Sequence, residues 1–116
     1  MRNAFIEELI ELASADPRIA LLTRERDEVS GQFAERFGER FYTIGEDEDD
    51  ILGVATRLAE AGGIPFAFTS ALPCDFAPPL PLRIVGVGGG LETVNSLAHH
   101  GLDDIGRLRV LPDVRV

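Results

Sequence analysis

The stretch FYTIGEDEDDILGVATRLAEAGGIPFAFT, residues 41–69, predicts a strand, a helix and a second strand in succession. Residues 41–44 form a short apolar run that ends at Gly45, and residues 64–69 form another. Between them, apolar residues recur at helical spacing over residues 51–59, and a glycine pair follows as a stop signal. A crossover helix between two such strands indicates a parallel pair and hence an α/β fold.

The rest of the chain extends this pattern in both directions. An amphipathic helix is predicted over residues 2–14, and Asp16-Pro17 ends it because the residue before a proline leaves the helical region. Further elements are expected as follows: strands over 18–22, 82–87 and 113–116, a short helix over 32–37 after a polar loop, and a partly helical region over 99–109. The sequence therefore predicts three layers, with a mostly parallel sheet between helices on both faces, in one domain spanning residues 1–116.

Composition narrows the classes of function. The net charge of −9 repels phosphate backbones, which argues against a nucleic-acid partner. No apolar run is long enough to span a membrane, and the acidic N-terminal helix does not resemble a secretory signal. All eleven basic residues are arginines, which excludes lysine Schiff-base chemistry. The single Cys74 suits a reducing compartment, so we expect a cytoplasmic protein.

Three unusual segments each follow a predicted strand. They are the acidic run at residues 46–50, a loop with four prolines at residues 70–81, and the glycines at residues 88–90. Ligands of parallel α/β sheets bind beyond the carboxyl ends of the strands, so the working surface is expected at that edge. The glycines do not indicate a dinucleotide site, because GVGGGL lacks the last glycine of the fingerprint and no clear helix follows.

Four blocks, taken in order, resemble the pyrimidine-binding domain of the transketolase superfamily: DPRIALLT, FAERFGERFYTIGEDEDDILGVATRLAEAGGIPFAFT, LPLRIVGVGGG and AHHGLDDIGRLRVLPDV. Relatives of this kind are transketolase, deoxyxylulose-phosphate synthase and the separate C-terminal subunits of split transketolases. The resemblance covers nearly the whole chain. It implies a shortened thiamine diphosphate-binding fold of pyrimidine-domain type. It also implies one subunit of an enzyme that makes or breaks a C–C bond next to a carbonyl, by two-carbon or acyl transfer, and that is not active alone.

Glu48 is the residue to which the resemblance gives the clearest role. The family reads Gly-Ile-Ala-Glu-Gln-Asn where this chain reads Gly-Glu-Asp-Glu-Asp-Asp at residues 45–50, so Glu48 falls on the catalytic glutamate. The resemblance implies that its carboxyl group binds the pyrimidine ring nitrogen of thiamine diphosphate and assists removal of the thiazolium proton. Two other interpretations stay open. The run can begin a helix, with Asp49 or Asp50 capping its amides, or it can hold a metal ion.

A second catalytic candidate is His99. The family carries a histidine that contacts substrate oxygens after its glycine-rich strand, in a Gly-Pro-Thr-His context, and His99 matches it without the preceding Gly-Pro-Thr. Asn95 falls where several relatives carry an aspartate, so both residues are expected to bind substrate. The alternative is that His99 and His100 are half-exposed residues that cap the start of a helix.

Aromatic residues that clamp the cofactor ring in relatives are mostly missing. Phe66, Phe68 and Phe76 are the candidates that remain, and Phe68 and Phe76 are the expected cofactor contacts beside Glu48. The segment between residues 68 and 82 is also shorter than in the family. The proline-rich loop replaces a helix that lines the cofactor site and the dimer interface.

The sequence has no Gly-Asp-Gly run with a downstream asparagine, the family's motif for diphosphate and Mg²⁺. The resemblance thus implies a partner subunit that carries the diphosphate-binding domain, holds Mg²⁺ and shares thiamine diphosphate with this chain, as a heterotetramer acting on a small molecule. Two alternatives remain. One is a degenerate structural or regulatory subunit of such a complex. The other is an unrelated α/β module that binds an anion at the strand-end glycines.

Overall fold

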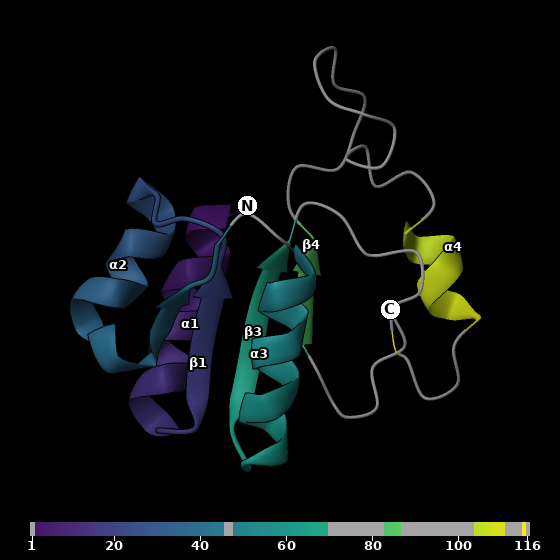
Figure 1. Ribbon diagram of the computed structural model, residues 1–116. Coiled ribbons are helices and arrows are strands. Elements are labelled where there is room, and N and C mark those ends of the chain that lie inside the picture. Colours follow the sequence, from purple (N-terminus) through teal and green to yellow (C-terminus); the bar gives the residue numbers. More distant parts are fainter. Residues whose placement is uncertain (1, 46–47, 70–82, 87–103, 111–114, 116) are drawn as a thin grey trace.

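The structure is a computed structural model that describes residues 2–45, 48–69, 83–86, 104–110 and 115. Its four strands form a parallel sheet in the order β2-β1-β3-β4, with helices on both faces (Figure 1). In chain order the elements are α1 (Arg2–Ala15), β1 (Ile19–Thr23), α2 (Glu28–Arg36), the 3-10 helix η1 (Gly38–Arg40), β2 (Phe41–Thr43), α3 (Glu48–Glu60), β3 (Ile64–Thr69), β4 (Arg83–Gly86) and α4 (Asp104–Arg109). The predicted α/β class and the parallel sheet are confirmed.

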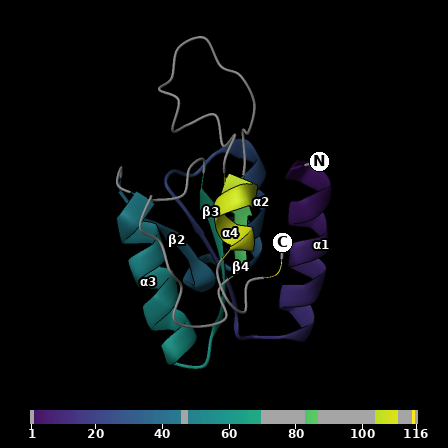
Figure 2. The same ribbon diagram turned by 90° about the vertical axis from the view of Figure 1, so that its right-hand side faces the viewer.

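The direction in which successive strands are added across the sheet reverses after β2. The connection from β1 runs to β2 on one side, and the next connection returns past β1 to β3, which continues to β4. Right-handed crossovers that run in opposite directions must lie on opposite faces of a sheet. The structure has this arrangement, because α2 lies with α1 on one face and α3 covers the other (Figure 2).

Alternate side chains of the central strand β1 supply both halves of the core. Leu21 packs with α1, α2 and Phe68, whereas Leu22 packs with α3 and Ala67, and both leucines are fully buried. Burial of such a side chain stabilises the fold by about 1.5–3 kcal/mol. A strand that is apolar on both faces is typical of a parallel sheet, which explains the continuous apolar run predicted around residues 18–22.

The start of α2 is the clearest difference from the sequence-based prediction. We expected a polar loop and then a short helix over 32–37, but α2 begins at Glu28. Asp27 caps it: the Asp27 carboxylate accepts the Ser30 N–H at 2.7 Å, and Ser30 Oγ accepts the Asp27 N–H at 3.1 Å. This reciprocal capping box satisfies amides that the first turn of a helix leaves without partners.

Other predicted boundaries agree with the structure within a few residues. The helix α1 ends at Ala15, directly before Asp16-Pro17, and α4 lies inside the region expected to be partly helical. The expected strand over 113–116 and the proline loop over 70–81 lie outside the described residues. No helix in the described ranges is long and apolar enough to cross a membrane.

Candidate functional site

The turn after β2 places the start of α3 at the carboxyl edge of the sheet. Thr43, the last residue of β2, pairs with Thr23 at the end of β1, and the Ile44 N–H donates to the Thr23 carbonyl oxygen at 3.0 Å. Gly45 then adopts a φ of +36°, a left-handed conformation that favours glycine. The helix α3 begins at Glu48, only a few residues after this edge of the sheet.

The backbone of Glu48 therefore lies at the edge where the sequence placed it. The structure describes Glu48 as the first residue of α3, but its side chain lies outside what is described. Asp49 and Asp50 fall within the first turn of α3 rather than at its N-cap, so the alternative in which one of them caps this helix does not fit the backbone. Acidic residues in a first turn still complement the positive end of the helix dipole.

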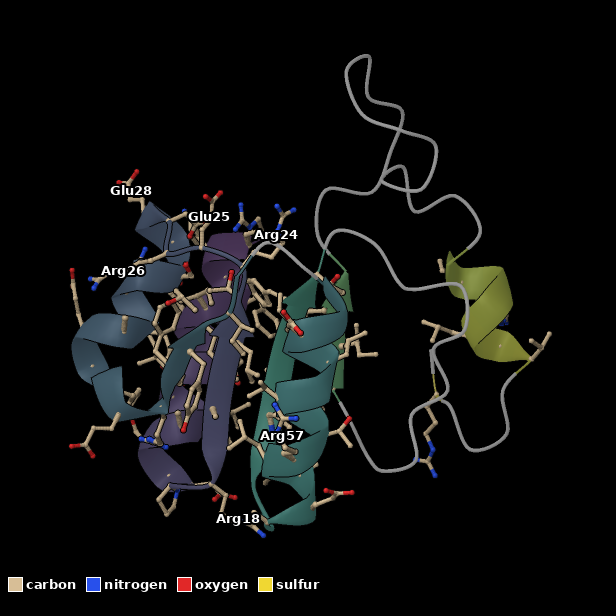
Figure 3. The ribbon with its side chains drawn as sticks, viewed as in Figure 1. Arg18, Arg24, Glu25, Arg26, Glu28 and Arg57 are labelled. Atoms are coloured by element: carbon tan, nitrogen blue, oxygen red, sulfur yellow. The ribbon has the colours of Figure 1, made fainter. Side chains whose placement is uncertain are left out.

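The loop between β1 and α2 borders the same edge. Thr23 is mostly buried, and its Oγ1 donates to the Glu25 carbonyl oxygen at 3.1 Å. Arg24, Glu25 and Arg26 are exposed, and Figure 3 shows them at the end of the sheet where α3 begins. These side chains and the first turn of α3 thus share the surface at which ligands of parallel sheets bind.

Asp27 closes this loop and is held from two sides. Its Oδ1 accepts the N–H and Oγ–H of Ser30, each at 2.7 Å, and its Oδ2 accepts a hydrogen bond from Nη2 of Arg2 on α1. Partial burial by itself would raise the pKa of Asp27, but the hydrogen bonds from Ser30 and Arg2 outweigh it and lower the pKa to about 2. Asp27 is therefore ionised throughout the neutral pH range.

Phe68, an expected cofactor contact, lies in the core. Its side chain is 3% exposed, and its ring packs against Phe5 of α1 with 5.3 Å between the centroids. Phe66 points to the same face, 6.0 Å from Phe5, and carries the Arg83 guanidinium over its ring. Neither aromatic lies on the face of β3 that α3 covers, so the structure gives Phe68 a packing role and the cofactor contact stays a prediction.

The other predicted contacts cannot be placed. Phe76, Asn95 and His99 lie outside the described residues, so their roles stay predictions. Neither Arg2 nor Asp27 was predicted from the sequence to lie near the carboxyl edge of the sheet. A signal for Asp27 was present, since aspartate is among the residues preferred at a helix N-cap.

A hollow of about 430 Å³ lies at the opposite, amino edge of the sheet. Its lining residues are Pro17, Arg36, Phe37, Gly38, Glu39 and Arg40. The Arg40 guanidinium lies over the Phe37 ring and donates to carbonyl oxygens of Ala13, Asp16 and Ile19 at 3.1–3.2 Å. Arg40 therefore ties the end of α1 to the start of β1, and this hollow is separate from the carboxyl edge. Over the described part of the chain, no group of three His, Cys, Asp or Glu residues could hold a metal ion.

Comparison with known proteins gives relatives along the whole chain. A 1-deoxy-D-xylulose-5-phosphate synthase from Azoarcus sp. (strain BH72) is 32% identical over 98% of this chain and 20% of its own length. A 6-deoxy-6-sulfo-D-fructose transketolase subunit from Clostridium sp. (strain MSTE9) is 28% identical over 100% of this chain and 40% of its own length. A transketolase C-terminal section from Methanocaldococcus jannaschii is 29% identical, over 100% of this chain and 41% of its own length.

A solved structure of a split-gene transketolase, an inactive β4 tetramer, has a TM-score of 0.79 and 30% identity, over 96% of this chain and 39% of its own. The chain thus spans about a fifth to two fifths of the length of these relatives. No model of a known protein family matches it. The transketolase-like resemblance drawn from the sequence is confirmed by these relatives and by the shared fold.

Proposed function

Because the chain is homologous along its whole length to transketolase C-terminal sections and to the matching region of 1-deoxy-D-xylulose-5-phosphate synthases, we propose that it is the pyrimidine-domain subunit of a split, thiamine diphosphate-dependent, transketolase-like enzyme. The reaction would make or break a C–C bond next to a carbonyl, by transfer of a two-carbon or acyl unit.

The observation that carries this proposal is the position of Glu48. Gly45 follows β2 in a left-handed conformation, and α3 begins at Glu48, at the carboxyl edge of the sheet, and packs on β3 and β1. This backbone placement fits a carboxyl group that reaches a ligand bound beyond the sheet. When bound, thiamine diphosphate supplies a thiazolium carbon that adds to carbonyl groups. Glu48 would share a proton with the pyrimidine nitrogen of the cofactor and so act in acid–base catalysis.

A partner subunit would supply the other half of the site. The solved relative is an inactive β4 tetramer of a split-gene transketolase, and the clostridial relative is a transketolase subunit. Both support an assembly in which this chain is not active alone. We propose that the partner holds the diphosphate and Mg²⁺, that the complex contains two copies of each chain, and that His99 and Asn95 bind the substrate, with Phe76 against the cofactor.

One observation favours the alternative of a non-catalytic subunit. Phe66 and Phe68 both point toward α1, and Phe68 is buried against Phe5. Neither is thus available on the α3 face of β3, so stacking on the cofactor ring would have to come from Phe76 or from the partner. Loss of one stacked aromatic weakens binding by about 0.5–1.5 kcal/mol beyond its buried area.

Reconstitution tests the proposal. A candidate partner is a polypeptide with a Gly-Asp-Gly run and a downstream asparagine, encoded beside this chain. The two chains are co-purified, and transfer from a ketose phosphate, a sulfonated ketose or pyruvate to an aldehyde acceptor is measured with Mg²⁺ and thiamine diphosphate. Transfer by the complex but by neither chain alone supports the catalytic function. A stable complex that binds the cofactor without transfer supports the alternative, and failure to associate rejects both.

A further inference from the structure

The β1–α2 loop, residues 24–27, lies where the sheet topology places a ligand crevice. The connection after β1 runs to β2 on one side of the sheet, and the connection after β3 runs to β4 on the other side. The crevice of a parallel α/β sheet opens beyond the carboxyl ends of two such strands. The loop begins directly after Thr23, the last residue of β1, and its first three residues are exposed there (Figure 3). Its conformation therefore shapes one wall of the proposed site.

This loop is anchored at both ends. At its start, Thr23 Oγ1 donates to the Glu25 carbonyl oxygen at 3.1 Å. At its end, Asp27 caps α2 through Oδ1. The Arg26 side chain lies across Gly31, where an added Cβ would come 3.2 Å from the Arg26 Nε. Its Nη2 is 3.9 Å from Oε1 of Glu35. All of these contacts are local to the loop and to α2.

Arg2 adds a contact from a different helix. Its guanidinium binds Oδ2 of Asp27, the oxygen that the cap does not use, and so joins the first turn of α1 to the loop. The side chains of Arg2 and Asp27 are 47% and 34% exposed, and an ion pair as exposed as this contributes little to global stability. Its effect should therefore be local, on the position of the loop relative to α1.

We propose that Arg2 is a positioning residue: through Asp27 it fixes the β1–α2 loop at the carboxyl edge and thereby raises the affinity of the assembled enzyme for the small molecule bound there. Without Arg2, Asp27 keeps its cap on α2, but the loop is no longer tied to α1. Ligand binding would then have to order the loop, which weakens affinity and leaves the chemical step unchanged. The effect on affinity rests on the proposed function, whereas the effect on the loop does not.

The variants separate the ion pair from the cap. Arg2→Ala removes the pair, Arg2→Lys keeps the charge, and Asp27→Ser keeps a capping oxygen but loses the contact with Arg2. The matched control is Arg18→Ala, which removes the Asp16–Arg18 pair at the opposite edge of the sheet. In the complex with the partner subunit, Arg2→Ala and Asp27→Ser should raise KM about 3- to 10-fold, with kcat within about two-fold of wild type. Arg2→Lys and Arg18→Ala should change neither constant.

Hydrogen exchange of the full-length chain tests the structural half without any assay of activity. The amides of Asp27 and Ser30, which donate to Ser30 Oγ and Asp27 Oδ1, should exchange faster in Arg2→Ala than in wild type because a loop released from α1 frays more often, whereas those of β1 should not. If the complex has no activity but this difference is seen, the proposed function fails and the positioning of the loop stands. Equal exchange in the two proteins would overturn the inference, and so would a fall in kcat at unchanged KM.

Discussion

The rings of Phe5 and Phe68 pack in the core with 5.3 Å between their centroids and a tilt of 46°. The contact joins α1 to β3 and turns the last aromatic of β3 away from α3. The resemblance to transketolases implies aromatic cofactor contacts near the end of this strand. In this chain, Phe68 packs against Phe5 of α1, so the two candidate functions differ in whether Phe68, Phe76 or the partner supplies the aromatic contact.

Phe68→Ala should destabilise the chain by about 3–5 kcal/mol, because it leaves a cavity under Phe5. Phe68→Leu keeps most of the volume and should cost less. Urea denaturation of the two variants measures the difference. If a folded Phe68→Leu complex binds thiamine diphosphate as tightly as wild type, Phe68 is a core residue only. Clearly weaker cofactor binding at near-wild-type stability would restore it as a cofactor contact.

Asp27 should make stability depend on pH in the acid range. Its pKa is lowered to about 2 from the ordinary value of 3.8, so its contribution to stability is complete above pH 4 and is lost as the pH falls through 2. Asp27→Asn should therefore be less stable than wild type at pH 7, and the difference should shrink toward pH 2. Denaturant titrations at several pH values test this. The control Glu11→Gln alters an exposed carboxylate on α1. Its difference from wild type in free energy of unfolding should not shrink toward pH 2 as that of Asp27→Asn does.

The turn at Gly45 and the helix that follows it could be predicted from the sequence, whereas the direction of Phe68 could not. Helical spacing after residue 50 and the glycine at residue 45 mark the turn and the helix, and both are local signals. The face toward which Phe68 points depends on tertiary packing, because β3 carries apolar residues on both faces: Phe66 and Phe68 on one, Ala67 on the other.

The start of α2 was missed for a different reason. Asp27 and Ser30 lie in a stretch rich in charged residues, in which few apolar positions reveal the helical period. The capping box fixes the first turn there, and Phe33 then anchors the helix in the core. The pairing of Arg2 with Asp27 spans 25 residues and could be found only from the structure.

The isolated chain should bind thiamine diphosphate very weakly, because no Gly-Asp-Gly motif for diphosphate and Mg²⁺ is present in its sequence. Isothermal calorimetry in the presence of Mg²⁺ should show little heat until the partner subunit is added. Tight binding to this chain alone would show that the cofactor site has been assigned to the wrong interface.

The chain should also assemble with its partner into a complex of two copies of each subunit. The proposed function places the cofactor between the two subunits, and closed two-fold symmetry is the commonest arrangement of oligomers. Size-exclusion chromatography with light scattering, with and without the partner, measures the mass. A monomer whose elution does not change on addition of the partner would contradict the assembly.

Exchange of the thiazolium C2 proton in the assembled complex tests the central claim most directly, because it reports the acid–base role of Glu48 without the natural substrate. Glu48→Gln keeps the shape of the side chain but cannot share the proton, so exchange into deuterium oxide should slow about 10²- to 10⁴-fold while the complex still forms. The control Asp50→Asn alters an exposed carboxylate in the same first turn of α3 and should leave exchange close to wild type. Exchange in the Glu48→Gln complex as fast as in wild type would contradict the catalytic role and leave the chain as a scaffold.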